Sequence, residues 1–304
     1  MPIHQSALSR RQFLHCSAAL FGGLVLSTRG QGAETADSTR IAFLSDTHIP
    51  ADPTLVSRDV NMTANLRHVV GEVCSWDAKP AGVIVSGDCA HLNGLSEDYA
   101  NFAGTIQPVT KAGLPLHLMT GNHDNREAMA GALAVKSPDH PLVQSRYASI
   151  LETPQANLFL LDSLTKTNVV TGEVGDDQRN WLSQALQARQ DKPAVVVVHH
   201  NLQLTPPAEG KPIGGLADSA AFLELLKSHR NVKAYIFGHT HNWSVKEMDG
   251  LHLINLPPVA YVFGKTHPNG WVQATLRPQG MELTLKTIDP QHPQNGERHE
   301  LLWN

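Results

Sequence analysis

The chain of 304 residues has few cysteines, few aromatic residues and no surplus of positive charge. Its three cysteines are too few for the disulfide framework that stabilises small secreted domains. Lysine and arginine number 24 against 28 aspartate and glutamate residues, so no basic excess favours nucleic-acid binding. The apolar stretch at residues 18–26 is shorter than the ~20 residues of a membrane-spanning helix. With 41% hydrophobic residues, the chain is expected to fold as one large globular domain.

Residues 1–35 have the organisation of a twin-arginine export signal. Arg10 and Arg11 precede the apolar stretch, and Gly32 and Ala33 supply small residues before a cleavage point. We predict a cleaved leader, a periplasmic or secreted mature protein without stable membrane insertion, and passage through the machinery that exports folded proteins. An uncleaved anchor or a chance Arg-Arg pair is the alternative. Cys16 falls in the leader, and Cys74 and Cys89 are predicted as buried thiols, although an oxidising compartment permits a disulfide.

Short apolar runs alternate with helical patterns along most of the chain. The runs, typical of strands buried on both faces, are residues 41–44, 82–85, 116–119, 158–161, 194–198 and 234–237. Apolar residues recur at helical spacing within 66–74, 97–109, 181–186 and 222–226. This alternation predicts an α/β fold with parallel pairing.

The last third has a different pattern. Short runs at 244–246, 251–255, 271–276 and 281–287 are separated by turn signals and predict antiparallel additions to the sheets. We expect one domain over residues 38–289 and an irregular polar tail over 290–304.

Metal-binding side chains follow the strong strands, at the point where each strand ends. Open α/β sheets form their sites at the carboxyl ends of strands, so these turns are expected to meet in one crevice. Histidine is unusually frequent, with 17 residues, and imidazole is the commonest protein metal ligand. The candidate ligands are Asp46, His48, Asp88, Asn122, His199, His239 and His241.

This donor set combines imidazole nitrogen with hard oxygen and contains no thiolate. It suits Zn, Fe, Mn, Co or Ni better than calcium or a soft metal. Seven ligands exceed the four of a single tetrahedral zinc, whereas two ions sharing a carboxylate use all seven. Two such ions ~3.5–4 Å apart can clamp the attacking and leaving oxygens of a phosphoryl displacement.

The spacing around the ligands adds a local expectation. Asp46 and His48 are two residues apart, as are His239 and His241, so on extended segments each pair faces one side. Gly87, Gly121 and Gly238 each precede a ligand, where the missing Cβ permits unusual backbone angles and close approach.

The ordered motifs resemble those of the calcineurin-like metallophosphoesterase superfamily. Within it, they are most similar to the branch of cyclic-nucleotide and glycerophosphodiester phosphodiesterases. The motifs are Asp46-x-His48, Gly87-Asp88, Gly121-Asn122-His123-Asp124, His199 and Gly238-His239-x-His241. The resemblance implies a four-layer αββα sandwich of two mixed sheets flanked by helices. It also implies two divalent or trivalent transition-metal ions (Fe, Mn, Zn or Co). Asp46, His48 and His241 would hold the first ion, Asn122, His199 and His239 the second, and Asp88 both.

The resemblance also implies catalytic roles. His123 would stabilise charge on the phosphate or protonate the leaving oxygen, Asp124 would orient His123, and a metal-bridging hydroxide would attack phosphorus. We therefore expect a metal-dependent phosphodiesterase acting on a small phosphoester. The alternatives are a phosphomonoesterase acting on nucleotides or phosphoproteins, and a non-catalytic metal-binding module with the same fold.

Several further residues lie near the motifs without being part of them. His200, adjacent to His199, is expected to support the ligands or the core, and His91 to face substrate or solvent. The Pro-Pro pair that commonly follows the paired histidines in this branch is replaced by Asn201-Leu202. The expected pocket walls are residues 49–58, 89–96, 201–217 and 256–268. Of the nearby aromatic residues Trp243, Tyr261 and Phe263, each is expected to pack in the core or stack on a substrate ring.

Overall fold

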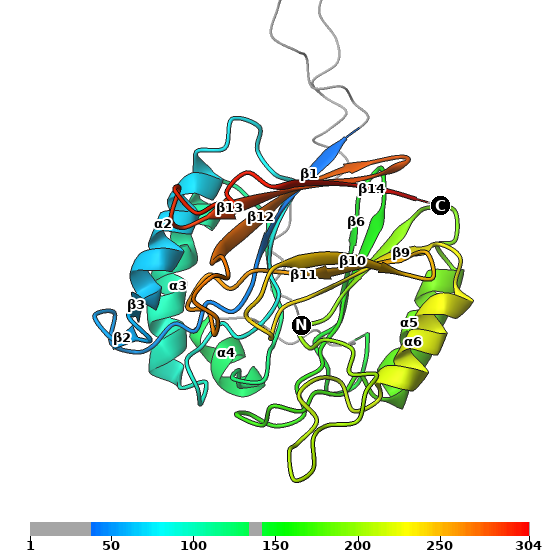
Figure 1. Ribbon diagram of the computed structural model, residues 1–304, viewed down its shortest axis with the longest axis horizontal. Helices are drawn as coiled ribbons and strands as arrows, with labels where there is room; N and C mark the ends of the chain where they lie inside the picture. Colours follow the sequence, from blue (N-terminus) through cyan, green and yellow to red (C-terminus); the bar gives the residue numbers. More distant parts are fainter. Residues whose placement is uncertain (1–37, 134–141, 304) are drawn as a thin grey trace, which may run out of the picture.

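Two six-stranded sheets lie face to face at the centre of the protein (Figure 1). The computed structural model describes residues 38–133 and 142–303, so the predicted leader with Cys16 lies outside the described residues. In spatial order, the first sheet contains β14 (Arg298–Leu302), β13 (Gly280–Thr287), β12 (Gly270–Arg277), β1 (Thr39–Leu44), β4 (Gly82–Val85) and β5 (Leu116–Leu118). The second contains β10 (Ser244–Met248), β11 (Leu251–Asn255), β9 (Val232–Phe237), β8 (Ala194–Val197), β7 (Asn157–Leu160) and β6 (Ser149–Glu152).

Helices cover the outer face of each sheet. The first sheet packs against α2 (Met62–Cys74), α3 (Ser96–Lys111) and α4 (Arg126–Ala132). The second packs against α5 (Asp176–Gln187) and α6 (Ser219–Ser228), on the opposite side of the molecule in Figure 1. A small hairpin, β2 (Val56–Ser57) and β3 (Val60–Asn61), precedes α2. The order of layers is α, β, β, α, which confirms the predicted four-layer architecture.

The continuous apolar runs are explained by burial on both faces of each sheet. Successive side chains of a strand point to opposite faces. Ile41 and Phe43 of β1 therefore lie in the core between the sheets, whereas Ala42 and Leu44 lie under the first helical layer. Each fully buried large apolar side chain stabilises the fold by about 1.5–3 kcal/mol.

Parallel pairing places the chemically active turns at one edge. Strand β1 pairs in parallel with β4, and β4 with β5, so the turns after these three strands emerge together. Strands β7, β8, β9 and β11 also pair in parallel. The turns that carry the candidate ligands in the two sheets are thereby available to meet.

The predicted irregular tail is wrong in part, because it contributes β14. Residues Arg298–Leu302 pair antiparallel with β13 from Thr284 to Gly280. Leu301 is buried in the core between the sheets, whereas Leu302 is 58% exposed. The strand was not predicted because the segment before it is polar and proline-rich and because the strand itself carries only one buried leucine.

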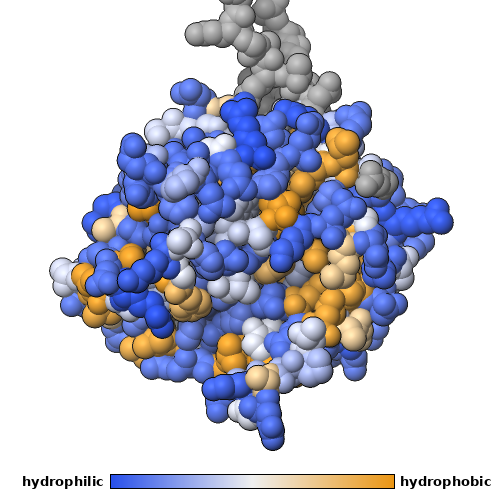
Figure 2. Space-filling view, viewed as in Figure 1, coloured by the Kyte–Doolittle hydropathy of each residue, from blue (hydrophilic) through white to orange (hydrophobic). Residues whose placement is uncertain are grey.

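The free cysteines and the mostly hydrophilic surface are both typical of a globular domain. Cys74 and Cys89 are both free thiols, but only Cys89 is buried as predicted, whereas Cys74 is half-buried. The hydropathy view shows a mostly hydrophilic face on which apolar residues form separate patches (Figure 2). Within residues 38–133 and 142–303, we find no helix with the length and apolar character required to cross a bilayer.

Candidate metal centre

Side chains from turns far apart in the sequence converge on one buried crevice. Three groups of potential metal-binding atoms form there, and within each group the atoms lie within 4.8 Å of one another. The groups are Asp46, His48 and His241; His48, Asp88 and His123; and Asp88, His199 and His239. His48 and Asp88 each belong to two groups, so the three groups are continuous. The first and third correspond to the two ligand sets implied by the motifs, apart from Asn122.

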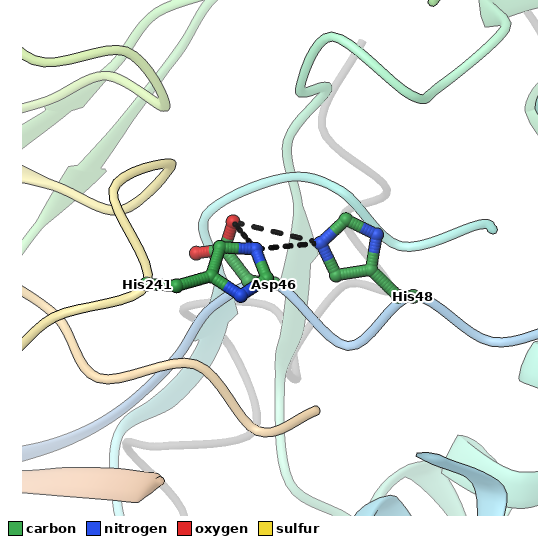
Figure 3. A group of neighbouring side chains, drawn as sticks. All are labelled: Asp46, His48 and His241. Carbon is green, nitrogen blue, oxygen red and sulfur yellow. Dashed lines mark hydrogen bonds and ion pairs between the residues drawn. The ribbon is translucent and has the colours of Figure 1, made fainter. Parts of the chain in front are cut away.

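The first group brings the turn after β1 against the turn after β9 (Figure 3). The Nε2 atoms of His48 and His241 lie 2.9 Å apart. Asp46 Oδ1 lies 3.4 Å from His241 Nε2 and 3.9 Å from His48 Nε2. All three residues are buried and point toward one another. Their donor atoms therefore face a common point.

Asp88, in the turn after β4, belongs to both the second and the third group. Asp88 Oδ2 lies 3.3 Å from His199 Nε2 and 3.6 Å from His48 Nε2. A single carboxylate oxygen thus contacts histidines of both ligand sets. His239, from the turn after β9, completes the third group. The placement of Asp88 between the two sets is what a carboxylate shared by two ions requires.

The ligands converge through left-handed backbone rather than through extended segments. The φ angles are 51° at Asp46, 45° at His48, 50° at Asp88, 66° at His239 and 52° at His241. Positive φ is uncommon outside glycine and costs of order 1–3 kcal/mol when it is strained. The expectation that Asp46 and His48 face one side of an extended segment is therefore wrong in its reason, although the side chains do converge. Such strain is concentrated where a protein positions functional groups.

Glycine is required where two of the ligand turns touch. A Cβ on Gly121 would lie 2.2 Å from Asp88 Oδ1 and 2.7 Å from His199 Nε2. A Cβ on Gly238 would lie 2.5 Å from Asp46 Oδ2. The prediction that these glycines permit close approach is confirmed.

Backbone carbonyls fix which nitrogen each histidine presents. A carbonyl oxygen can only accept a hydrogen bond, so the ring nitrogen beside it carries the hydrogen. His199 Nδ1 donates to Ser86 O at 3.0 Å, His241 Nδ1 to Tyr261 O at 2.5 Å and His239 Nε2 to Gly214 O at 2.8 Å. The other nitrogen of each ring is then a lone-pair donor directed into the crevice. Orientation by a carbonyl is the usual support for metal-binding histidine.

Buried polar atoms without partners show that the residues fit metal ions. Among residues 38–133 and 142–303, His199 Nε2 and Asn122 Oδ1 are buried and find no hydrogen-bond partner. A buried polar atom left unpaired costs about 1–3 kcal/mol, and a bound cation would satisfy it. The ion-pair partners of Asp46 and Asp88 are histidines, which are neutral when they bind metal. The imidazole, carboxylate and amide donors fit first-row transition ions.

The carboxylates and imidazoles shift one another's pKa values. Burial raises the pKa of Asp88, but His199 and His48 outweigh it and hold that pKa well below the ordinary range. Burial alone would lower the pKa of His199, whereas the Asp88 carboxylate raises it to about 9. For His48, burial dominates and lowers the pKa to about 3. The Asp88 carboxylate is thus negatively charged and lies between a neutral imidazole, His48, and a readily protonated one, His199.

His123 lies beside His48 and Asp88 in the second group. Its backbone N–H donates to Asp88 Oδ1 at 2.8 Å, and its Nδ1 donates to Leu92 O at 2.9 Å. Its ring packs edge-on against that of His48, with centroids 5.2 Å apart. His123 is half-buried, and because Nδ1 bonds to Leu92 O, Nε2 is the ring nitrogen that remains for another contact.

Asp124 has different partners from those implied by the motif. It was expected to orient His123, yet the Leu92 carbonyl holds that ring. The Asp124 carboxylate is fully buried and accepts from the backbone N–H groups of Cys89, Ala90 and Gly121 at 2.8–3.1 Å. It also accepts from the Tyr99 hydroxyl at 2.9 Å. Burial, and then the nearby Asp88, raise the pKa of Asp124 to about 6. Asp124 therefore fastens the turns after β4 and β5 to each other.

Two further histidines, His200 and His91, lie next to the candidate site, and His200 has the supporting position that we expected. His200 is buried, donates to or accepts from Ser163 Oγ at 2.7 Å, and packs on His239 with ring centroids 4.6 Å apart. It supports a candidate ligand rather than adding to the three groups. His91 is half-buried in the turn that contains Leu92. The supporting carbonyls of Leu92, Gly214 and Tyr261 lie within three of the predicted wall loops, but backbone groups leave no signal in a sequence.

Comparisons with known proteins agree with this geometry. The pattern of the family described as "Calcineurin-like phosphoesterase" matches residues 39–243. A probable cyclic nucleotide phosphodiesterase of Synechococcus sp. is 27% identical, over 82% of this chain and 91% of the relative. The 3′,5′-cyclic adenosine monophosphate phosphodiesterase CpdA of Haemophilus influenzae is also 27% identical, over 81% of this chain and 85% of the relative. Among solved structures, a dimetal phosphatase from Danio rerio has the same fold, with a TM-score of 0.66 at 15% identity, over 88% of this chain and 99% of that chain.

Proposed function

Because the chain belongs to the calcineurin-like phosphoesterase family and is a hydrolase of phosphoester bonds, we propose that it is a dinuclear phosphodiesterase acting on small phosphodiesters, with cyclic nucleotides as the leading candidates. The observation that carries the proposal is the position of Asp88, which contacts His48 of one ligand set and His199 of the other through the same oxygen. The cyclic-nucleotide names of relatives that match four-fifths of the chain support the substrate class.

The protein's own residues would hold two cations in distinct surroundings. Asp46, His48 and His241 would bind one ion, and Asn122, His199 and His239 the other, with Asp88 shared. Two cations in such a site supply Lewis-acid stabilisation of a phosphoryl group and activate water at neutral pH. The donor set is compatible with Fe, Mn, Zn and Co and does not select one of them.

His123 would act on the leaving group. The Leu92 carbonyl fixes the hydrogen on Nδ1, so Nε2 is the atom that exchanges a proton with substrate. In its protonated form, His123 would donate from Nε2 to the departing ester oxygen and stabilise developing negative charge. The Asp88 contact to the His123 backbone holds this residue beside the shared carboxylate.

We further propose that the protein acts outside the cytoplasm. The support is the order of twin arginines, apolar stretch and small residues within positions 1–35. Fusion of these residues to a reporter enzyme tests it. Export is expected for the natural sequence and loss of export for the variant with Arg10→Lys and Arg11→Lys; equal export of both would contradict a twin-arginine signal.

A rate comparison on purified, metal-defined protein tests the activity. The substrates are cyclic AMP, a glycerophosphodiester, bis-p-nitrophenyl phosphate and p-nitrophenyl phosphate, each compared by kcat/KM. We expect the diesters to exceed the monoester. A preference for p-nitrophenyl phosphate would favour a phosphomonoesterase, and absence of turnover on all four with metal bound would favour a non-catalytic metal-binding module.

A further inference from the structure

We propose that Arg58, Tyr261 and Phe263 form a subsite that binds the planar aromatic group of the substrate, such as a nucleobase. This aromatic subsite deepens the proposed phosphodiesterase function and rests on it. It lies against His48 and His241, on the side of the crevice formed by the first ligand group. The sequence indicated Tyr261 and Phe263 as aromatic residues near the candidate ligands and placed Arg58 at the end of the predicted wall segment 49–58, but it did not indicate that these residues meet.

An exposed aromatic ring, that of Phe263, stacks directly on the candidate metal ligand His241. The ring of Phe263 stacks on that of His241, with centroids 4.4 Å apart and an interplanar angle of 22°. The ring of Tyr261 stacks on that of His48 at 5.3 Å and the same angle. Phe263 is nevertheless 59% exposed, whereas Tyr261 is buried. A large aromatic ring that remains exposed beside a reaction centre is suited to contact a ligand.

Arg58 reaches this aromatic pair from a different part of the chain. Its guanidinium carbon lies 5.3 Å from the Tyr261 ring centroid and 5.1 Å from that of Phe263. Both distances are within the ~6 Å range of a cation–π interaction. The guanidinium therefore lies beside both rings. An arginine plane can stack on a base while its N–H groups bond to the edge of the base.

The hairpin that carries Arg58 has an unfavourable turn sequence. Strands β2 and β3 are joined by Arg58 and Asp59, whose φ angles are 51° and 65°. A two-residue turn with two positive φ angles favours Asn-Gly, because most side chains are strained there. Arg58 occupies the first of these positions despite the strain. Strained backbone at an exposed arginine next to a reaction centre is consistent with a functional constraint.

Hydrogen bonds connect both sides of the subsite to the rest of the fold. Asn61, at the end of the hairpin, caps α2 by accepting from Ala64 N–H at 2.7 Å. Asn65 in the next turn of α2 donates to Val259 O at 3.0 Å, which ties the helix to the segment before Tyr261. That segment is itself bonded to the first ligand turn, through Ala260 N–H and Asp46 O at 3.0 Å. Arg58 and the aromatic pair are thereby fixed relative to the candidate metal centre.

This arrangement favours a planar ring over an anion or a flexible chain. An anion would be bound by Arg58 alone and would not require an exposed phenylalanine beside it. A flexible apolar chain would not require a guanidinium. A nucleobase uses both, because every base has a stacking face and a hydrogen-bonding edge. A phosphodiester whose phosphorus lies at the crevice would extend such a base along the wall formed by His241 and Phe263.

Paired substrates test the aromatic subsite. Cyclic AMP carries a base, and glycerophosphoethanolamine carries none. Phe263→Leu removes the ring and keeps apolar volume, so it is expected to raise KM for cyclic AMP about tenfold and leave KM for glycerophosphoethanolamine within about twofold. Phe263→Trp retains a ring and should restore the KM for cyclic AMP. Leu302→Ala, at a similarly exposed residue of the distant strand β14, is the matched control and should change neither.

A second variant separates the guanidinium plane from its charge. Arg58→Lys keeps the positive charge and removes the plane, so KM for cyclic AMP should rise several-fold. An unchanged KM would show that Arg58 acts only as a charge and would remove it from the subsite. Equal effects of Phe263→Leu on both substrates would show a structural role in holding His241 and would overturn the proposal.

Equilibrium binding distinguishes failure of the subsite from failure of the proposed function. Titration calorimetry measures adenosine 5′-monophosphate and glycerol 3-phosphate binding to the metal-loaded wild type and Phe263→Leu. We expect only the nucleotide to lose affinity, about tenfold. If wild type hydrolysed neither diester, the phosphodiesterase function would fail while this measurement still decided the subsite. Equal affinities of both proteins for the nucleotide would overturn the subsite.

Discussion

Single residues in the crevice are held by backbone groups as much as by side chains. Leu92, Gly214 and Tyr261 each use a carbonyl oxygen to fix a histidine. Asp124 uses its carboxylate to gather three backbone N–H groups of two ligand turns. Such supports are known to change metal affinity or activity by about 10–100-fold when they are removed. The residue types therefore determine which donor atoms are present, whereas hydrogen bonds with the backbone determine the direction in which these atoms point.

The role of His123 can be separated from metal binding. His123→Ala is expected to lower kcat by about 10²–10⁴-fold, because it removes the proton donor to the leaving oxygen. The loss should be larger for an alkyl diester, whose leaving group needs a proton, than for bis-p-nitrophenyl phosphate. Metal content, measured by mass spectrometry, should stay at the wild-type level. An equal loss on both substrates would contradict the proton-donor role.

Gly121 tests the close approach between the turns after β4 and β5. Gly121→Ala places a Cβ against Asp88 Oδ1 and His199 Nε2, so we expect a 10–100-fold loss of metal affinity. Gly104→Ala is the control, because its Cβ would meet nothing within 4 Å. Calorimetric titration of the metal-free proteins measures the difference. Equal affinities of the two variants would mean that the turns can separate without cost.

At the scale of the elements, the sequence predicted most strands of the two sheets but not the β2–β3 hairpin, α4 or the edge strand β14. Continuous apolar runs identified β1, β4, β8 and β9 because burial on both faces leaves a strong hydrophobic signal. The β2–β3 hairpin has only four paired residues and α4 only seven, too short for a periodic pattern to emerge. Strand β14 has alternating charged residues and one buried leucine. Its pairing with β13 is a long-range contact that local composition does not encode.

Strand β14 contributes to stability through Leu301. Leu301→Ala is expected to lower the free energy of unfolding by about 2–5 kcal/mol, because it leaves a cavity between the sheets. The adjacent Leu302→Ala changes an exposed side chain and should alter stability by no more than about 0.5 kcal/mol. Urea unfolding followed by circular dichroism measures both. Equal effects would contradict the observed inward direction of Leu301.

A buried ion pair joins α4 to the end of β7. Asp162 is fully buried and accepts from Arg126 Nε and Nη2, both at 2.7 Å, and from Thr120 Oγ at 2.7 Å. Burial raises the pKa of Asp162, but the bonds from Arg126 outweigh it and leave the pKa below its ordinary value. Removing one partner of such a pair costs about 3–5 kcal/mol.

We therefore expect Asp162→Asn to be destabilised by about 3 kcal/mol at neutral pH. A lowered folded-state pKa contributes stability above the unfolded value of about 3.9, and this contribution is lost as pH falls through the folded value. The difference between wild type and variant should thus shrink below about pH 4. Urea unfolding at several pH values checks this. A difference that grows on acidification would contradict the ionised state of Asp162.

At the scale of the whole molecule, the two sheets and their helices form a frame for one crevice. The motifs predicted every residue that the structure brings into the three groups, because parallel strands place their carboxyl ends at one edge. The left-handed backbone at Asp46, His48 and His241 was not predictable, since it depends on contacts between turns. Arg58 lies in the predicted wall segment 49–58, but its contact with Phe263 was not predictable, because the hairpin meets Phe263 only in the folded chain.

Metal should stabilise the fold as well as support hydrolysis. Asp46 and Asp88 are buried carboxylates whose close partners are histidines, so bound cations would offset their desolvation. Ligand at 100 times its dissociation constant adds about 2.7 kcal/mol to the free energy of unfolding. We expect chelation to lower the thermal midpoint and re-addition of metal to restore it. An unchanged midpoint would argue against metal binding in the crevice.

The most direct measurement is a titration of hydrolysis against metal added to the chelated, metal-free protein. Bis-p-nitrophenyl phosphate turnover is followed while bound metal per chain is quantified by mass spectrometry. The predicted result is no turnover without metal and a plateau at two ions per chain, with Asp88→Asn failing to reach it. Full turnover in the metal-free protein, or a plateau at one ion, would contradict a two-ion centre built around Asp88.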